Sequence, residues 1–134
     1  MKNKIHPLIY WTPRVLSILL LLFLTLFSFD VFGQGYGFWG TALAFFMHNI
    51  PVIIGLILLI IAWKYEIVGS IAFLFGGFFY IFLLVFGGNF EWFMLVWAVQ
   101  LSGPAFLIGI LFWIGWRKKR KLRNQEPTKQ INNL

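Results

Sequence analysis

Cysteine is absent from this 134-residue chain, and acidic residues are scarce, with four Asp and Glu against eleven Lys and Arg. Without cysteine, disulfides, thiolate metal sites and cysteine nucleophiles are excluded. Only 11% of the residues are charged, whereas 60% are hydrophobic, including seventeen Phe and seven Trp. A soluble domain of this length could not cover so many large apolar side chains. The composition therefore indicates an integral membrane protein.

Four long apolar segments predict an all-α fold, a four-helix bundle built from two hairpins. We expect one membrane domain over residues 1–116, with spans at about 13–32, 38–63, 67–86 and 92–116. Thr12 would cap the first span, and Pro13 would be its first helical residue. Residues 117–134 are polar and basic, so we expect a largely disordered tail there.

The placement of Lys and Arg predicts how the chain crosses the membrane. Cations precede the first span, occur at residue 64 and follow the last span, but the turns near residues 33–41 and 87–91 have none. Short loops rich in Lys and Arg stay in the cytoplasm, which predicts that both termini are cytoplasmic. No small-residue cleavage site follows the first span, so we expect it to be retained, as in a bacterial inner-membrane protein.

A basic run follows the last span, and we expect it to bind anionic lipid headgroups. Each such cation near an anionic leaflet contributes about 1 kcal/mol. This position explains the net charge of +7 without nucleic-acid binding, and a specific lipid or protein partner is the alternative. The run consists of Arg117, Lys118, Lys119, Arg120, Lys121 and Arg123.

The two predicted hairpins share a pattern of Trp, Pro, Trp and a cation at an offset of 53 residues. Trp marks both membrane interfaces and the cation marks the cytoplasmic end, while Pro51 and Pro104 are expected to kink their spans. Interface Trp and end cations recur in any pair of spans, so only the Pro at the matching position is more than two unrelated spans would show. The pattern consists of Trp39, Pro51, Trp63 and Lys64, followed by Trp92, Pro104, Trp116 and Arg117.

Several polar residues fall in the outer half of the predicted spans. Polar groups in hydrocarbon are costly and face a partner or a cavity, so these side chains would line a polar vestibule if they face inward. In that arrangement His48 could accept a proton or contact a ligand. Alternatively, His48 and Asn49 bond a neighbouring helix, and the carboxylates lie among headgroups. The candidate residues are Asp30, His48, Asn49, Glu91 and Gln100.

Small residues spaced three and four apart form stripes on the third and fourth spans. Such stripes let helix backbones approach closely in lipid. We expect these two spans to pack against each other along the stripes, although self-association would use the same surface. The residues are Gly69, Ala72 and Gly76 in the third span, and Ala98, Ser102, Ala105 and Gly109 in the fourth.

The chain has no recognisable catalytic motif. Paired haem ligands, zinc motifs, nucleophile motifs and phosphate loops are missing, so we expect neither enzymatic activity nor a cofactor or metal. Lys64 and Glu66 lie in the short turn between the second and third spans. They are expected only to contact headgroups and cap helix ends.

Four short motifs resemble a group of small bacterial multi-spanning proteins that is known only as a domain of unknown function. The resemblance covers the first three spans and implies no activity, substrate or cofactor. It singles out Asp30, His48 and Pro51 as the first residues to test. The motifs are Phe29-Asp30-Val31-Phe32, Gly37-Phe38-Trp39, His48-x-x-Pro51 and Ala62-Trp63-Lys64-Tyr65-Glu66-x-x-Gly69.

Two classes of function fit these observations. One is a small, oligomeric transporter or channel-like protein for an ion, a proton or a small solute. Four spans enclose little volume, so a pore would need several copies. The other is an accessory or scaffold subunit whose helices bind a partner membrane protein and whose basic tail binds anionic lipid.

Overall fold

The computed structural model describes residues 5–88 and 91–132, with side chains described up to residue 125. Four of its helices are long and apolar enough to cross a membrane, which confirms the predicted all-α, four-span architecture. A short 3-10 helix, η1, directly extends the first of them. The elements are α1 (Pro7–Phe27), η1 (Ser28–Gly33), α2 (Gly37–Lys64), α3 (Glu66–Phe86) and α4 (Met94–Asn132).

The first helix begins at Pro7 and not at the predicted Pro13. A ring nitrogen of His6 accepts a hydrogen bond from the Leu8 amide at 3.4 Å and thereby caps the helix. Pro7 then fills the first helical position, where its missing amide costs no hydrogen bond. Pro13 lies inside the helix. The predicted start was wrong because an equivalent start signal occurs earlier in the chain.

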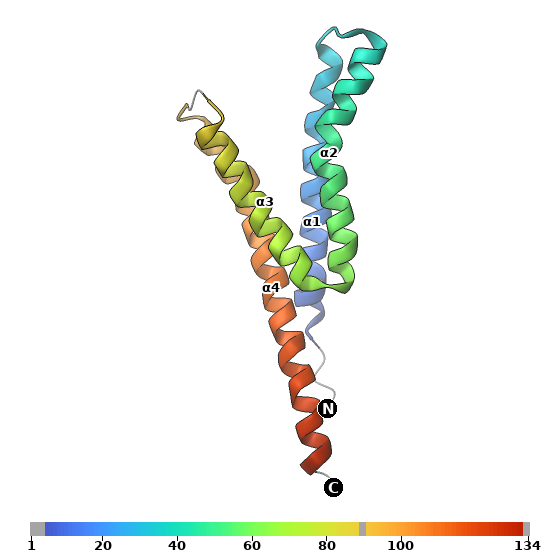
Figure 1. Cartoon of the computed structure of the whole chain (residues 1–134), viewed down its shortest axis with the longest axis vertical. Helices are drawn as coiled ribbons and strands as arrows, with labels where there is room; N and C mark the ends of the chain where they lie inside the picture. Colours follow the sequence, from blue (N-terminus) through green and yellow to red (C-terminus); the bar gives the residue numbers. More distant parts are fainter. Residues whose placement is uncertain (1–4, 89–90, 133–134) are drawn as a thin grey trace.

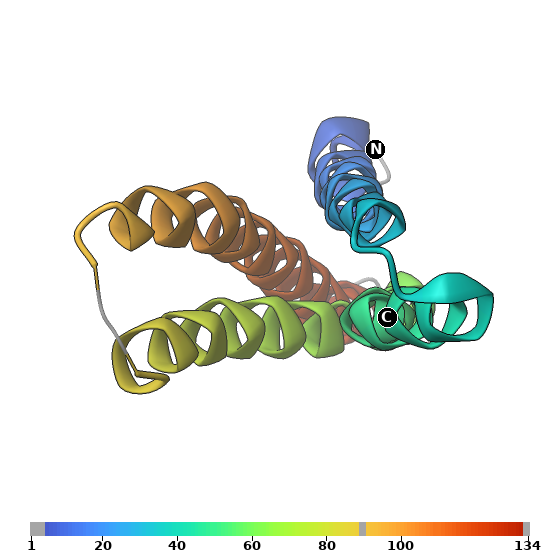
Figure 2. The same cartoon turned by 90° about the horizontal axis from the view of Figure 1, so that it is seen from above.

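The four helices form two hairpins, α1–α2 and α3–α4, which meet at one end and spread apart at the other (Figure 1). We call the meeting end, with the start of α1 and the α2–α3 turn at Tyr65, the closed end. The other end, with η1 and the α3–α4 connection, is the open end. Figure 2 shows the α3–α4 hairpin leaning away from the α1–α2 hairpin.

The buried core joins the hairpins and includes side chains from all four helices. Phe112 of α4 and Ala62 of α2 are fully buried, and the Phe112 ring stacks on Phe73 of α3 at 6.1 Å between centroids. The parallel rings of Phe73 and Phe112 and the short side chain of Ala62 allow α2, α3 and α4 to approach one another closely at this point. The core consists of Leu21, Leu59, Ala62, Phe73, Ala105, Ile108 and Phe112.

The stripe of small residues predicted on α4 is buried over its whole length. Ala98, Ser102, Ala105 and Gly109 all lie inside the structure. A Cβ atom added to Gly109 would lie 2.7 Å from Leu74 Cγ and 3.1 Å from the Leu74 backbone nitrogen. Only glycine therefore permits the observed distance between α3 and α4 at this level.

The stripe predicted on α3 differs from the prediction in its last member. Gly69 is buried and Ala72 is half-buried, but Gly76 is exposed, and no atom lies within 4 Å of the position that a Cβ atom would occupy there. Gly77 is buried instead, and an added Cβ at this residue would lie 2.8 Å from the Phe106 ring. Spacing alone could not identify Gly77, because the rotation of α3 about its axis determines which of the two adjacent glycines faces Phe106 of α4.

Within the α3–α4 interface, the Ser102 hydroxyl donates a hydrogen bond to the Gly77 carbonyl at 3.0 Å. Ser102→Ala is expected to lower the free energy of unfolding by about 0.6–2 kcal/mol, the range of interhelical bonds in membranes. Denaturant titration in mixed micelles would measure the loss. Ser17→Ala is the control, because the Ser17 hydroxyl bonds the Pro13 carbonyl of its own helix. Equal losses in both variants would contradict this role of Ser102.

The fourth helix continues far beyond the predicted membrane boundary at residue 116 and ends at Asn132. Disorder was predicted for residues 117–134, and the structure is instead helical through residue 132, with residues 133–134 outside the described part. Lys, Arg, Leu and Gln are good helix formers, and extending an existing helix avoids the cost of nucleation. The six predicted headgroup-binding cations are all exposed on this extension.

Candidate functional site

The closed end contains an ion cluster in which Arg14 and Glu66 are buried and Lys119 is partly exposed. The Arg14 side chain is completely buried, and its Nη2 donates to Glu66 Oε1 at 3.1 Å and to the Trp63 carbonyl at 3.2 Å. Arg14 Nη1 donates to the Tyr10 carbonyl. The guanidinium group thus connects α1 with the end of α2 and the start of α3. Charges inside a membrane protein are retained when they pair in this way.

Aromatic rings surround the Arg14 guanidinium group. Its central carbon lies 3.6 Å from the centroid of the Tyr10 ring and 5.8 Å from those of Trp63 and Phe112. These distances are within the range of cation–π attraction, which strengthens when the cation is removed from water. The rings therefore replace part of the hydration that Arg14 loses on burial.

Glu66 is 4% exposed and accepts from two cations at one oxygen. Lys119 Nζ donates to Oε1 at 2.8 Å, and this Lys side chain is 43% exposed. Glu66 also lies in the first turn of α3, where the helix dipole favours a negative charge. Its Oε2 atom has no hydrogen-bond partner among the described residues and faces Gly115 of α4. Glu66 is consequently the point at which α1, α3 and α4 are joined.

The expectation that Glu66 only contacts headgroups and caps a helix end was wrong, because its carboxylate is buried. Lys64, in contrast, is exposed, and its ammonium group lies 5.5 Å from the Tyr65 ring centroid. Sequence reasoning missed the cluster because the partners of Glu66 are 52 and 53 residues away in the chain. One feature of the sequence could have indicated the cluster: Glu66 is an acidic residue on the side of the membrane to which all Lys and Arg residues were assigned.

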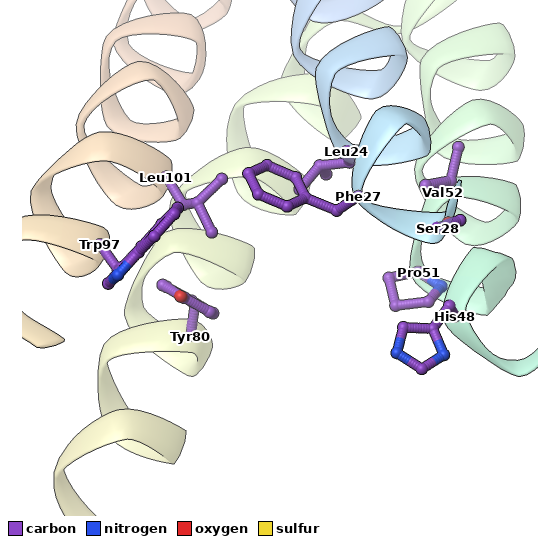
Figure 3. A pocket seen from close by; sticks show the side chains of 9 residues that line it. All are labelled: Leu24, Phe27, Ser28, His48, Pro51, Val52, Tyr80, Trp97 and Leu101. Carbon is purple, nitrogen blue, oxygen red and sulfur yellow. The ribbon is translucent and has the colours of Figure 1, made fainter. Parts of the chain in front are cut away.

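A cavity of about 370 Å³ lies between the two hairpins, toward the open end (Figure 3). One wall comes from α1, η1 and α2, and the opposite wall comes from α3 and α4. The rings of Phe27 and Trp97 meet edge to face across it, with 5.8 Å between centroids. We call this space the hairpin cavity, and its lining residues are Leu24, Phe27, Ser28, His48, Pro51, Val52, Tyr80, Trp97 and Leu101.

The wall of the hairpin cavity is mostly apolar, with a few hydrogen-bonding groups. Ser28 is 1% exposed, and its hydroxyl has no hydrogen-bond partner among the described residues. His48 Nδ1 lies 3.0 Å from the Ala44 carbonyl, which requires a proton on Nδ1. Tyr80 belongs to the opposite wall (Figure 3). A few polar groups in an apolar wall are typical of small-molecule sites.

The five predicted vestibule residues do not share one cavity. Of these, only His48 lines the hairpin cavity, while Gln100 lines a second cavity of about 290 Å³ between α1 and α4. Asp30 and Glu91 are exposed and line neither of them. Asn49 Nδ2 donates to the Phe45 carbonyl of its own helix at 2.9 Å. The sequence predicts the depth of these residues in the membrane, but the rotation of each helix about its axis determines which way each side chain points.

The two prolines expected to kink their spans lie inside uninterrupted helices. Pro51 belongs to α2 and lines the hairpin cavity, whereas Pro104 belongs to α4 and lines the second cavity. His48 and Asn49 were expected to bond a neighbouring helix beside the Pro51 kink, but they bond carbonyls of α2 itself. The prolines therefore occupy cavity walls in both hairpins.

Within the described part of the chain, no three His, Asp or Glu side chains gather as metal ligands would. Charged groups are concentrated in the ion cluster and on the extension of α4, and the hairpin cavity is lined by uncharged side chains and His48. This arrangement suits the binding of an uncharged, largely apolar molecule.

Comparison with known proteins identifies a family but no described relative. A family model for a domain of unknown function (DUF7670) matches residues 1–124, so the chain belongs to this family. No curated protein and no solved structure matches the chain significantly. The family has no assigned function, and the structure adds four helices that are long and apolar enough to cross a membrane.

Proposed function

We propose that this member of the DUF7670 family is a non-enzymatic accessory membrane protein that holds a bilayer-derived apolar molecule between its two hairpins. The observation that carries this proposal is the hairpin cavity, bounded by both hairpins and lined mainly by apolar side chains. The ion cluster supports it, because it fastens the hairpins at one end while they remain apart at the other.

The orientation belongs to the same proposal. Both termini would be cytoplasmic, so the basic extension of α4 would lie on the cytoplasmic side and reach anionic headgroups or an acidic partner protein. Two arginines of this extension lie over tryptophan rings, Arg117 over Trp113 at 5.1 Å and Arg120 over Trp116 at 5.3 Å. Lys119 differs from its neighbours because it contacts Glu66.

Transport of an ion, a proton or a small polar solute is less well supported. A polar solute needs a continuous polar lining, and the candidate vestibule residues are divided between two cavities and the exposed surface. A pore formed by several copies would need these residues to meet across subunits. Proton or ion flux into proteoliposomes that His48→Ala abolishes would favour transport over the proposed function.

Photocrosslinking can identify the occupant of the hairpin cavity. A photoreactive residue replacing Leu101, which lines the cavity, is expected to capture lipid that persists through detergent washing. The matched control replaces Val99, two residues away on the same helix and 72% exposed, where loosely held lipid washes away. Mass spectrometry of the irradiated protein would compare the two adducts. Capture of a protein helix at Leu101, or equal capture at both sites, would contradict the proposal.

A further inference from the structure

Beyond an apolar occupant in general, we infer that the hairpin cavity binds a neutral, single-chain amphiphile such as a monoacylglycerol. Its acyl chain would lie along Leu24, Val52 and Leu101, and its hydroxyl or ester oxygens would meet Ser28 and Tyr80. This inference rests on the proposed function and specifies the chemical class of the occupant. Size, hydrogen bonding and charge support it independently.

The size of the hairpin cavity, about 370 Å³, is that of a small-molecule site. Small-molecule sites range from about 300 to 1,000 Å³, and this cavity lies near the lower limit, where one acyl chain fits better than a two-chain lipid.

The unpartnered hydroxyl of Ser28 indicates that the ligand carries a polar group. Its hydroxyl is buried and has no partner among the described residues, an arrangement that costs about 1–3 kcal/mol. A ligand oxygen bonded to Ser28 would remove this cost. His48 is the second polar group of the same wall, and because its Nδ1 donates to the Ala44 carbonyl, Nε2 of the neutral ring can accept from a ligand hydroxyl. Tyr80 offers a phenolic hydroxyl from the other wall.

The depth of Ser28, His48 and Tyr80 in the membrane indicates where the polar head of the ligand would lie. His48 lies eleven residues into α2, roughly 16 Å from the start of the helix at 1.5 Å per residue. Ser28 and Tyr80 lie closer to the open ends of their helices. The ligand's polar end would therefore sit between the open end and the middle of the membrane, deeper than free lipid headgroups.

The distribution of charge favours a neutral head. Among the side chains that the structure describes, every Lys and Arg belongs to the closed end or to the extension of α4. The acidic residues Asp30 and Glu91 instead lie at the open end. A carboxylate or phosphate in the hairpin cavity would find no cationic side chain among its lining residues and would approach these two acids. A glycerol or alcohol head avoids both costs.

The test uses the full chain in nanodiscs and a diazirine-labelled monoacylglycerol as the probe. We expect photolabelling of peptides that line the hairpin cavity, and unlabelled monooleoylglycerol should compete at least about tenfold better than oleate, which has the same acyl chain. Ser28→Ala and Tyr80→Phe should each weaken competition about fivefold or more, the size of one hydrogen bond. Ser17→Ala is the control, because this buried serine of α1 lies outside the cavity.

Thermal stability separates a lost hydrogen bond from a misfolded variant. Without ligand, Ser28→Ala should be at least as stable as the natural chain, because it removes an unsatisfied hydroxyl, while its stabilisation by monooleoylglycerol should shrink. Equal competition by oleate, or unchanged binding in a folded Ser28→Ala variant, would overturn the inference and leave the proposed function intact. Failure of the Leu101 position to capture any lipid would instead remove the proposed function itself.

Discussion

Replacing Arg14 with methionine is expected to lower the free energy of unfolding by about 3–5 kcal/mol, the cost of breaking a buried ion pair on one side. Methionine keeps much of the side-chain volume but leaves the 4%-exposed Glu66 carboxylate without its buried partner. It also removes the hydrogen bonds to the Tyr10 and Trp63 carbonyls. Denaturant titration in mixed micelles, followed by tryptophan fluorescence, would measure the loss.

The matched control is Arg117→Met, because Arg117 is exposed on the α4 extension and its removal should change stability little. Lys119→Met should have a smaller effect than Arg14→Met, because Lys119 is 43% exposed. The double variant Arg14→Met with Glu66→Met removes both buried charges and should recover part of the loss. If Arg14→Met and Arg117→Met were equally stable, the ion cluster would not hold the hairpins together.

The second large effect is expected from Gly69→Ala, which should destabilise the fold by about 1–3 kcal/mol through overpacking. An added Cβ would lie 2.8 Å from Ala62 Cβ and 2.9 Å from the Phe112 ring. Neither neighbour can withdraw easily, since Ala62 Cβ is fixed to its backbone and Phe112 is fully buried. The helices would have to separate at the point where α2, α3 and α4 meet.

Gly76→Ala on the same helix is the control for Gly69→Ala. No atom lies within 4 Å of the Cβ position at Gly76, so the added methyl group causes no steric overlap. Because alanine has a higher helix propensity than glycine, the free energy of unfolding should stay constant or rise by up to about 1 kcal/mol. Both variants would be compared by thermal unfolding in the same detergent. A loss at Gly76 equal to that at Gly69 would show that both glycines pack against neighbours, contrary to the observed divergence of the hairpins.

The number and type of helices could be predicted because long apolar runs report directly on membrane crossing. Their ends were less predictable. Pro7 and Pro13 carry the same start signal, and only the capping contact of His6 identifies the earlier one. At the other end, the hydrophobic run stops near Trp116 while α4 continues to Asn132, because basic residues of high helix propensity end a span without ending a helix.

The candidate site was less accessible to sequence reasoning. The sequence does single out His48, because a polar residue inside a span is costly unless it faces a partner or a cavity, and His48 lines the hairpin cavity. Ser28 and Tyr80 could not, because serine and tyrosine are ordinary near the ends of spans. Which of them share a wall depends on the angle between two hairpins, and no local pattern encodes this angle.

Four membrane crossings by an all-α chain follow from the sequence without any knowledge of the packing, because hydropathy and length are local properties of each segment. Where charge is buried and where space remains depends instead on how the hairpins pack. Glu66 and Lys119 are separated by 53 residues, and their contact exists only because the hairpins meet at the closed end. Beyond that contact the hairpins diverge and the hairpin cavity lies between them, because the side chains that still meet there, such as Phe27 and Trp97, do not fill the space.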